Sequence, residues 1–209
     1  MAMAAKESGA DLIGLVFAAG SRRRISLAAA QEIASKVSGI GKVGVFVNAP
    51  LNEVRTIARD LRLDFVQLHG DEPPEYCREV GVPVIKAVRA DLALSAAAPD
   101  LDSHPAAWIL LDSFAKSQFG GTGIPFDWAA LRPVREQLSK PLLIAGGLTG
   151  ENVRAAVRIL RPEGVDVSSG VETGGEKDRG KMADFVRAVR MAESEEIFDA
   201  GCFSAGKNC

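Results

Sequence analysis

The chain has 209 residues, of which 47% are hydrophobic and 25% charged, and its formal net charge is −2. A chain of this length buries a substantial core, and the composition is ordinary for a globular protein. The near-balanced charge and the single short basic run, Arg22-Arg23-Arg24, argue against a nucleic-acid partner. No apolar run reaches membrane-spanning length, so no membrane partner is expected.

The three cysteines, Cys77, Cys202 and Cys209, are odd in number and far apart along the chain. A disulfide framework is therefore not expected. The N-terminus also lacks the long apolar core of a signal peptide. Together these features predict a protein of the reducing cytoplasm.

Short apolar runs alternate with helix-length amphipathic segments along the whole chain. After an opening helix over Met1–Ser8, the predicted strands are Leu12–Phe17, Lys42–Val47, Leu63–Leu68, Pro83–Val88, Ala107–Asp112, Pro141–Ala145 and Gly164–Ser168. The predicted helices are Leu27–Ser38, Leu51–Leu61, Pro74–Val80, Trp128–Leu138, Glu151–Leu160 and Lys181–Met191. Each strand is apolar on both faces, which is typical of buried parallel strands. The alternation predicts one α/β domain over residues 1–209.

The predicted strands suit a (β/α)8 barrel rather than a doubly wound sheet, because no G-x-G-x-x-G turn follows the first strand. A barrel of this kind closes with eight strands, and only seven are evident. The tail over 192–209 is our candidate for the eighth. In this hypothesis Ala192–Ala200 turns beneath the barrel, and Phe203–Cys209 forms a strand between the first and last strands.

Two glycine-containing turns follow consecutive predicted strands. Gly146 and Gly147 come directly after one strand, and Ser169 and Gly170 follow the next. Glycines let backbone N–H groups approach a ligand, and a helix N-terminus beyond the turn adds partial positive charge. The pair therefore predicts a phosphate site at the barrel mouth. The alternative is that the glycines only make tight turns.

The motifs together resemble the phosphoribosylanthranilate isomerase family of tryptophan biosynthesis, from about residue 9 to residue 190. The matching segments are Gly-Ala-Asp-Leu-Ile-Gly-Leu-Val-Phe (9–17), Ser-Arg-Arg-Arg-Ile (21–25), Val-Gly-Val-Phe-Val-Asn (43–48), Leu-Asp-Phe-Val-Gln-Leu-His-Gly-Asp-Glu (63–72), Leu-Leu-Asp-Ser (110–113), Gly-Gly-Thr-Gly (120–123), Ala-Gly-Gly-Leu (145–148) and Val-Asp-Val-Ser-Ser-Gly-Val-Glu (165–172). The resemblance implies a (β/α)8 barrel that isomerises a phosphorylated sugar-anthranilate, as a monomer or a homodimer, without a metal or organic cofactor.

The chain departs from the family at its start. The family opens with a strand of the form Val-Lys-x-Cys-Gly, whose cysteine is the general base, and no such strand begins this chain. The chain does end in Lys207-Asn208-Cys209, which matches Lys-x-Cys. One hypothesis is a circular permutation that brings Cys209 to the mouth as the base. The other is a truncated chain with an unrelated tail.

The resemblance also implies the reaction, an Amadori rearrangement. An acid protonates the ring oxygen of a ribosylamine, and a base takes the proton from C2 of the sugar. Asp112 is the candidate acid, because it ends an apolar strand; its alternative role is to cap the following loop. Cys209 is the candidate base, although its own α-carboxylate opposes formation of the thiolate.

Three further side chains are candidates for binding the substrate. Arg23 would pair with the anthranilate carboxylate, to which a planar guanidinium offers a bidentate fit, or it is plain solvated charge beside Arg22 and Arg24. Asp166 would hydrogen-bond the sugar hydroxyls or the amine. His69 lines the anthranilate pocket or satisfies loop backbone groups.

Two alternative functions remain at this point. The first is the related aminoimidazole carboxamide ribotide isomerase of histidine biosynthesis, which runs the same rearrangement. Its two-fold sequence repeat and first-strand aspartate are not found here. The second is a catalytically inactive phosphate-binding barrel, which the truncated-chain hypothesis favours.

Overall fold

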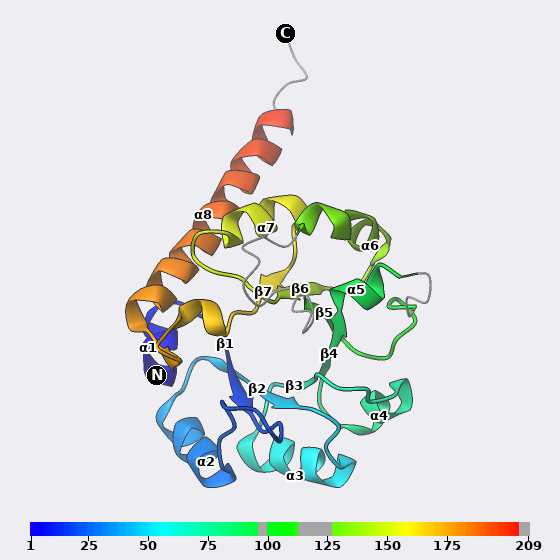
Figure 1. The fold of residues 1–209 in the computed structure, drawn as a ribbon, viewed down its shortest axis with the longest axis vertical. Coiled ribbons are helices and arrows are strands. Elements are labelled where there is room, and N and C mark those ends of the chain that lie inside the picture. The colour runs from blue at the N-terminus through cyan, green and yellow to red at the C-terminus, as the bar shows by residue number, and fades with distance from the viewer. Residues whose placement is uncertain (96–99, 113–126, 205–209) are drawn as a thin grey trace.

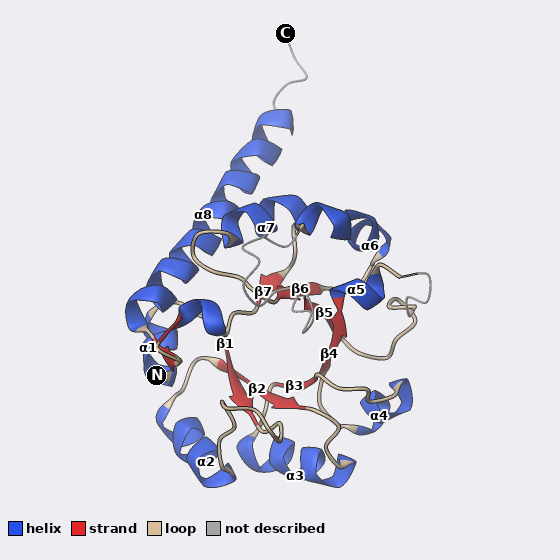
Figure 2. Ribbon diagram, in the orientation of Figure 1, coloured by secondary structure: helices blue, strands red, loops and turns tan. Residues whose placement is uncertain are grey.

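The computed structural model describes residues 1–95, 100–112 and 127–204. Seven parallel strands form one sheet in the order β1-β2-β3-β4-β5-β6-β7, so each strand pairs with its neighbour in the chain. The sheet curls around a central axis, and the helices lie outside it (Figures 1 and 2). The predicted α/β barrel architecture is therefore confirmed.

The strands all occur where the apolar runs predicted them, with small shifts at their ends, except that β7 covers only the first two of the five residues predicted over Gly164–Ser168. They are β1 (Leu12–Val16), β2 (Gly41–Phe46), β3 (Phe65–Leu68), β4 (Val84–Arg89), β5 (Trp108–Asp112), β6 (Leu142–Ala145) and β7 (Gly164–Val165). The helices are α1 (Ala2–Glu7), α2 (Leu27–Lys36), α3 (Leu51–Leu61), α4 (Pro74–Glu79), α5 (Ala90–Ala93), α6 (Arg132–Gln137), α7 (Val153–Leu160) and α8 (Arg179–Ser204). Two 3₁₀ turns, η1 (Trp128–Leu131) and η2 (Ser169–Val171), and a short hairpin of β8 (Glu172–Thr173) and β9 (Glu176–Lys177) complete the described elements.

Two local differences from the predicted elements have physical causes. The single helix predicted over Trp128–Leu138 is split into η1 and α6, and Pro133 at the start of α6 has no N–H to continue the earlier turn. Asp127 caps η1 by accepting a hydrogen bond from the Ala129 N–H at 3.0 Å. The short helix α5 and the β8–β9 hairpin were not predicted, because segments of two to four residues show no hydrophobic period.

Side chains alternate between two cores along each strand. A small cluster fills the inside of the barrel, and its members are Val43, Ile85, Ala87, Leu110 and Ala145, with Phe65, Trp108 and Leu143 packed against it. A larger cluster lies between sheet and helices and includes Ile109, Leu111, Leu142 and Ile144, each fully buried. Burying each such side chain contributes about 1.5–3 kcal/mol. Because the period is two residues, the inner cluster identifies which strand-end side chains point into the mouth.

The hypothesis that the tail supplies an eighth strand is wrong for residues 192–204. The predicted turn over Ala192–Ala200 and the first two residues of the predicted strand instead continue α8 as one helix through Ser204, and 205–209 lie outside the described residues. The segment 192–204 has no proline and only one β-branched residue, Ile197, so it favours helix over strand. Glu195 also ties this part of α8 to α7 through Arg154, at 2.5 Å, and Arg158. Figure 1 shows α8 extending past the barrel wall.

The two ends of the sheet, β1 and β7, do not pair with each other in the described part of the chain. The N-terminal helix α1 packs against α8 on this side of the barrel (Figure 1). In the same part of the chain, no helix is both long enough and apolar enough to cross a membrane.

Candidate active site

Three predicted site residues come together because of the strand period. His69 lies two residues beyond Gln67 on the inward side of β3, and its N–H continues the ladder to the Phe46 carbonyl at 2.9 Å. Asp112 lies two residues after Leu110, an inner-core residue. Asp166 falls between Val165 and Val167, which pack on the outer core, and so faces inward. All three side chains therefore reach the same end of the barrel from different strands.

His69 and Asp112 are in direct contact. The His69 Nε2 atom lies 3.1 Å from Oδ2 of Asp112, and the Gln67 amide nitrogen lies 2.9 Å from His69 Nδ1. An amide that donates to Nδ1 leaves the ring proton on Nε2, which His69 then donates to the carboxylate. The two roles predicted for His69, lining the anthranilate pocket or satisfying loop backbone groups, stay predictions; the structure adds its contact with the candidate acid.

Asp166 lies in a setting that disfavours its charge. Burial raises the pKa of its carboxyl, and the nearby Asp112 carboxylate raises it further, while His69 and Lys177 oppose the shift. A buried carboxyl beside a second carboxyl keeps its proton more readily, because burial and the repulsion between like charges both disfavour its charged form. The site therefore holds one carboxyl inclined to keep its proton beside one that is hydrogen-bonded by a histidine.

The two glycine turns pack against each other. A Cβ added to Gly170 would lie 1.8 Å from the Leu148 carbonyl oxygen, so the second turn touches the first through bare backbone. Gly146 and Gly147 both have positive φ, at 88° and 63°. The Asn152 side chain braces the first turn, accepting from the Thr149 N–H at 2.8 Å and donating to the Gly147 carbonyl at 2.9 Å. The structure thus brings together Gly146, Gly147, Ser169 and Gly170, as the sequence predicted.

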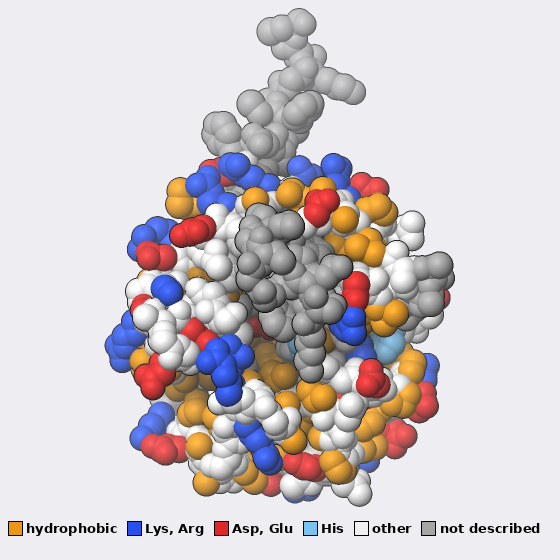
Figure 3. Space-filling view, in the orientation of Figure 1, with side chains coloured by type: hydrophobic (Ala, Val, Ile, Leu, Met, Phe, Trp, Pro, Cys, Tyr) orange, Lys and Arg blue, Asp and Glu red, His pale blue; other side chains and the backbone are white. Residues whose placement is uncertain are grey.

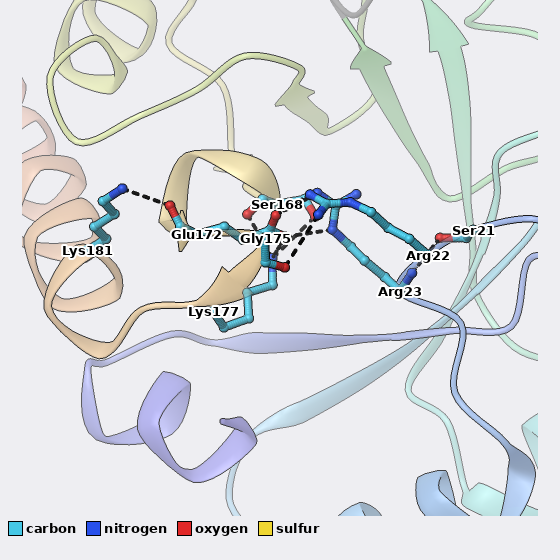
Figure 4. A network of polar contacts seen from close by, with 8 residues as sticks. All are labelled: Ser21, Arg22, Arg23, Ser168, Glu172, Gly175, Lys177 and Lys181. Carbon is cyan, nitrogen blue, oxygen red and sulfur yellow. Dashed lines mark hydrogen bonds and ion pairs between the residues drawn. The ribbon is translucent and has the colours of Figure 1, made fainter.

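Arg23 is joined to a residue that the sequence analysis did not select, Glu172 (Figure 4). Arg23 Nε and Nη2 donate to the two carboxylate oxygens at 2.6 and 3.0 Å. Arg22 pairs with the same carboxylate, and Lys177 Nζ lies 3.0 Å from it. The Glu172 side chain is only 5% exposed. The hydrogen bond from Arg23, with help from Lys177, lowers the pKa of this carboxyl to about 2, although burial works against the shift.

Further contacts connect this ion cluster to the second glycine turn. Lys177 Nζ donates to the Ser168 carbonyl at 2.7 Å, next to Ser169. Lys181, in the first turn of α8, donates to the Glu172 carbonyl oxygen at 2.7 Å. Figure 4 shows Arg22 and Arg23 reaching from the loop after β1 toward the β8–β9 hairpin. Figure 3 shows one face of the barrel hollowed near its centre, with Lys and Arg side chains beside the hollow.

The sequence analysis missed Glu172, Lys177 and Gln67 as members of the site. Glu172 ends the segment 165–172 that resembles the family, and Lys177 follows it. Nothing in the local sequence indicates that either side chain pairs with Arg23. The pairing depends on a contact across about 150 residues, which only folding creates. Among the residues that the structure describes, no three His, Cys, Asp or Glu side chains are grouped as a metal ion would need. Cys209, the predicted base, lies outside the described residues.

Comparison with known proteins identifies the family. The model for N-(5'-phosphoribosyl)anthranilate isomerase matches residues 1–188. The curated isomerase of Moorella thermoacetica is 44% identical over 192 residues, which are 91% of this chain and 85% of that protein. The isomerase of Magnetococcus marinus is 45% identical over 197 residues, covering 92% and 90% of the two chains.

Solved structures agree with the sequence relatives. Phosphoribosyl anthranilate isomerase from Thermotoga maritima has a TM-score of 0.79 at 38% identity, covering 91% of this chain and 93% of that one. A phosphoribosyl anthranilate isomerase in complex with reduced 1-(o-carboxyphenylamino)-1-deoxyribulose 5-phosphate has a TM-score of 0.76 at 36% identity, covering 91% and 92%. The chain therefore belongs to the N-(5'-phosphoribosyl)anthranilate isomerase family, and its activity is the isomerisation of phosphoribosylanthranilate in tryptophan biosynthesis.

Proposed function

We propose that the isomerisation takes place at the mouth formed by β3, β5, β6 and the β7–α8 connection, with Asp112 as the general acid. The observation that carries this proposal is the convergence of His69, Asp112 and Asp166 beside the paired glycine turns. The test is to follow conversion of phosphoribosylanthranilate by the purified chain and by variants of these three residues. Inactivity of the parent chain would contradict it.

Asp112 would protonate the ring oxygen of the ribosylamine as the C1–O bond opens to a Schiff base. The His69 contact at 3.1 Å orients the Asp112 carboxyl at the mouth. Loss of the proton from C2 of the sugar then gives an enolamine, and tautomerisation gives the ketone. His69 is a positioning residue in this scheme, because it acts through Asp112.

The phosphate of the substrate would lie between the two glycine turns, held by backbone N–H groups. The support is the bare-backbone contact of Gly170 with the Leu148 carbonyl and the open space beside Gly147. Phosphate at this place puts the sugar over Asp112 and Asp166. Asp166 would then hydrogen-bond the sugar hydroxyls or the amine, and a carboxyl inclined to keep its proton can donate as well as accept there.

Arg23 would pair with the anthranilate carboxylate. It reaches from the loop after β1 to Glu172, which lies two residues after Gly170 of the second glycine turn (Figure 4). A guanidinium suits this contact because it offers two parallel N–H donors to a carboxylate. The pairing with Glu172 holds the side chain in the mouth.

The assignment of Cys209 as the general base stays a prediction. One of its two supports, a closing strand over Phe203–Cys209, is removed by the course of α8, and the Lys207-x-Cys209 match remains. Cys209→Ser tests it directly, since a hydroxyl is far harder to deprotonate than a thiol. A folded but inactive variant supports the assignment, and unchanged turnover assigns the C2 proton to another group.

The setting of the activity is part of the same proposal. The odd, scattered cysteines support a reducing cytoplasm. The substrate is a small phosphorylated molecule, no cofactor takes part, and the chain acts as a monomer or homodimer. The Thermotoga maritima relative is described as dimeric and has also been solved as generated monomers, which supports either state.

A further inference from the structure

Glu172 is the centre of a cluster of charged side chains at the mouth. Its side chain is 5% exposed, whereas Arg22, Arg23 and Lys177, which contact it, are 57%, 31% and 30% exposed. A buried carboxylate held by three cations is fixed in place, so it is the part of the cluster that determines where the others point.

The contact with Arg23 uses one particular edge of the guanidinium. Nε and Nη2 form the side edge, and both donate to Glu172, at 2.6 and 3.0 Å. Among the described residues, Nη1 of Arg23 donates to no protein group. A guanidinium has a second edge, made by Nη1 and the other hydrogen of Nη2, which fits another carboxylate in the same plane. Glu172 therefore occupies one edge and leaves the outer edge available.

The charge of the cluster leaves Arg23 able to attract a second anion. Three cationic side chains share the single Glu172 carboxylate, so these four groups carry two more positive than negative charges. A one-to-one pair would have neutralised Arg23. Here the surplus remains beside the turn that contains Ser168, to which Lys177 also donates.

We propose that Glu172 is a positioning residue that turns the outer edge of the Arg23 guanidinium toward the carboxylate of the aromatic amine, and so sets the preference of the site for a carboxylated substrate. This inference rests on the proposed role of Arg23. Glu172 touches no reacting atom in it. Without the buried carboxylate, the guanidinium would lose its fixed plane and much of its directional advantage over a simple charge.

The test measures recognition of the carboxylate separately from the rest of binding. The probes are reduced 1-(o-carboxyphenylamino)-1-deoxyribulose 5-phosphate and the same compound with hydrogen in place of the carboxyl group. The ratio of their dissociation constants reports the carboxylate contact, which is worth about 10- to 100-fold for a charge-assisted bidentate pair. Titration calorimetry on the full chain gives both constants.

Glu172→Gln retains size but places an amide nitrogen against a guanidinium donor. We expect it to reduce the ratio at least about fivefold while changing the affinity of the probe without the carboxyl by less than about threefold. Arg23→Met should bring the ratio close to one. Glu195→Gln is the matched control, because Glu195 also pairs with two arginines but between α7 and α8, and it should keep the parent ratio.

The outcomes separate a failure of the positioning role of Glu172 from a failure of the proposed role of Arg23. If Glu172→Gln keeps the parent ratio of dissociation constants, or lowers the affinity for both probes equally, the positioning role is overturned. The role of Arg23 still stands in that case if Arg23→Met brings the ratio close to one. A parent chain with no preference, or an Arg23→Met protein that keeps it, overturns the proposed role of Arg23 itself. If Glu172→Gln does not fold, Glu172→Asp withdraws the carboxylate by one methylene, and an unchanged ratio in that variant overturns the proposal.

Discussion

At the scale of single residues, two carboxyl groups share the barrel mouth and differ in their surroundings. Asp112 is contacted by His69, which is itself held by Gln67. Asp166 has its charged form disfavoured by burial and by the neighbouring Asp112 carboxylate. We propose different tasks for the two groups: Asp112 protonates the ring oxygen, and Asp166, which is inclined to keep its proton, hydrogen-bonds the sugar hydroxyls or the amine.

Asp112→Asn keeps the shape of the side chain and removes the proton to be donated. We expect turnover to fall about a hundredfold or more, with little change in the affinity for reduced 1-(o-carboxyphenylamino)-1-deoxyribulose 5-phosphate. Asp60→Asn, on α3 and away from the mouth, is the control and should keep parent turnover. Near-normal turnover of Asp112→Asn would make Asp112 structural.

Asp166→Asn should separate stability from activity. The folded-state pKa of Asp166 is raised above its usual 3.8, so the folded protein holds this proton more tightly than the unfolded chain does. Its ionisation therefore costs stability as the pH rises above about 4. We expect Asp166→Asn to gain stability relative to the parent between pH 4 and pH 7 while losing turnover. Urea unfolding at the two pH values measures the gain, and an equal difference at both would contradict it.

At the scale of elements, loops that follow neighbouring strands are locked to each other by buried polar groups. Glu72 accepts hydrogen bonds from the backbone N–H groups of Asn48, at 2.7 Å, and Gly70, at 3.0 Å. Lys86 on β4 contacts the same carboxylate at 2.8 Å and the Gly70 carbonyl at 2.5 Å. Burial alone would raise the pKa of Glu72, but the bonds from Lys86 and Asn48 lower it overall. The network fixes the turn that begins at His69.

Lys86→Met tests this network. It leaves the Glu72 carboxylate buried without its cation, which costs about 3–5 kcal/mol of unfolding free energy. The double change Glu72→Gln with Lys86→Met should recover part of that loss, because the uncompensated charge is gone. Denaturant midpoints of the parent, Lys86→Met, Glu72→Gln and the double variant give the comparison. A double variant as unstable as the sum of its single changes would show that the two side chains act independently.

Gly170→Ala tests the contact between the two glycine turns. The added Cβ would lie 1.8 Å from the Leu148 carbonyl oxygen, so one turn must move. We expect the free energy of unfolding to fall by about 1–3 kcal/mol. We also expect the affinity for the phosphate-bearing compound, reduced 1-(o-carboxyphenylamino)-1-deoxyribulose 5-phosphate, to fall about tenfold or more. Gly81→Ala is the control for backbone strain without a clash, because the φ of Gly81 is positive, at 88°, and nothing lies within 4 Å of the added atom. A Gly170→Ala protein that keeps the parent affinity for the phosphate-bearing compound would contradict the prediction.

At the scale of the whole molecule, the Glu172 cluster connects the two ends of the sheet. Arg22 and Arg23 belong to the loop after β1, and Glu172 follows the turn after β7, so their ion pairs span the side of the barrel where β1 and β7 do not pair in the described residues. Helices α1 and α8 pack together on the same side. Electrostatic contacts thus add to helix packing where strand pairing is absent from that part of the chain.

This arrangement predicts a pH dependence of stability. The pKa of Glu172 is lowered from 4.5 to about 2 in the folded protein, so its contribution is complete above about pH 4.5 and is lost as the pH falls toward 2. The stability difference between the parent and Glu172→Gln should therefore be largest above pH 4.5 and shrink toward pH 2. Glu195→Gln shows how far a more exposed pair contributes. A difference that stays constant with pH would contradict the prediction.

The short runs that are apolar on both faces determined the strands, and the motif positions at their ends determined the family and the end of the barrel that carries the site. Asp112, Asp166 and the glycine turns could be selected in this way, because each stands next to a strand in the sequence itself. Two kinds of feature needed the folded chain. The composition of 192–204 favours helix, but only the folded chain shows that α8 runs past Met191 against α7, and Glu172 meets Arg22 and Arg23 only where β1 and β7 approach from opposite ends of the sequence. Strand period is a local property, whereas ion pairing and burial arise from contacts between residues far apart, and only the tertiary structure creates them.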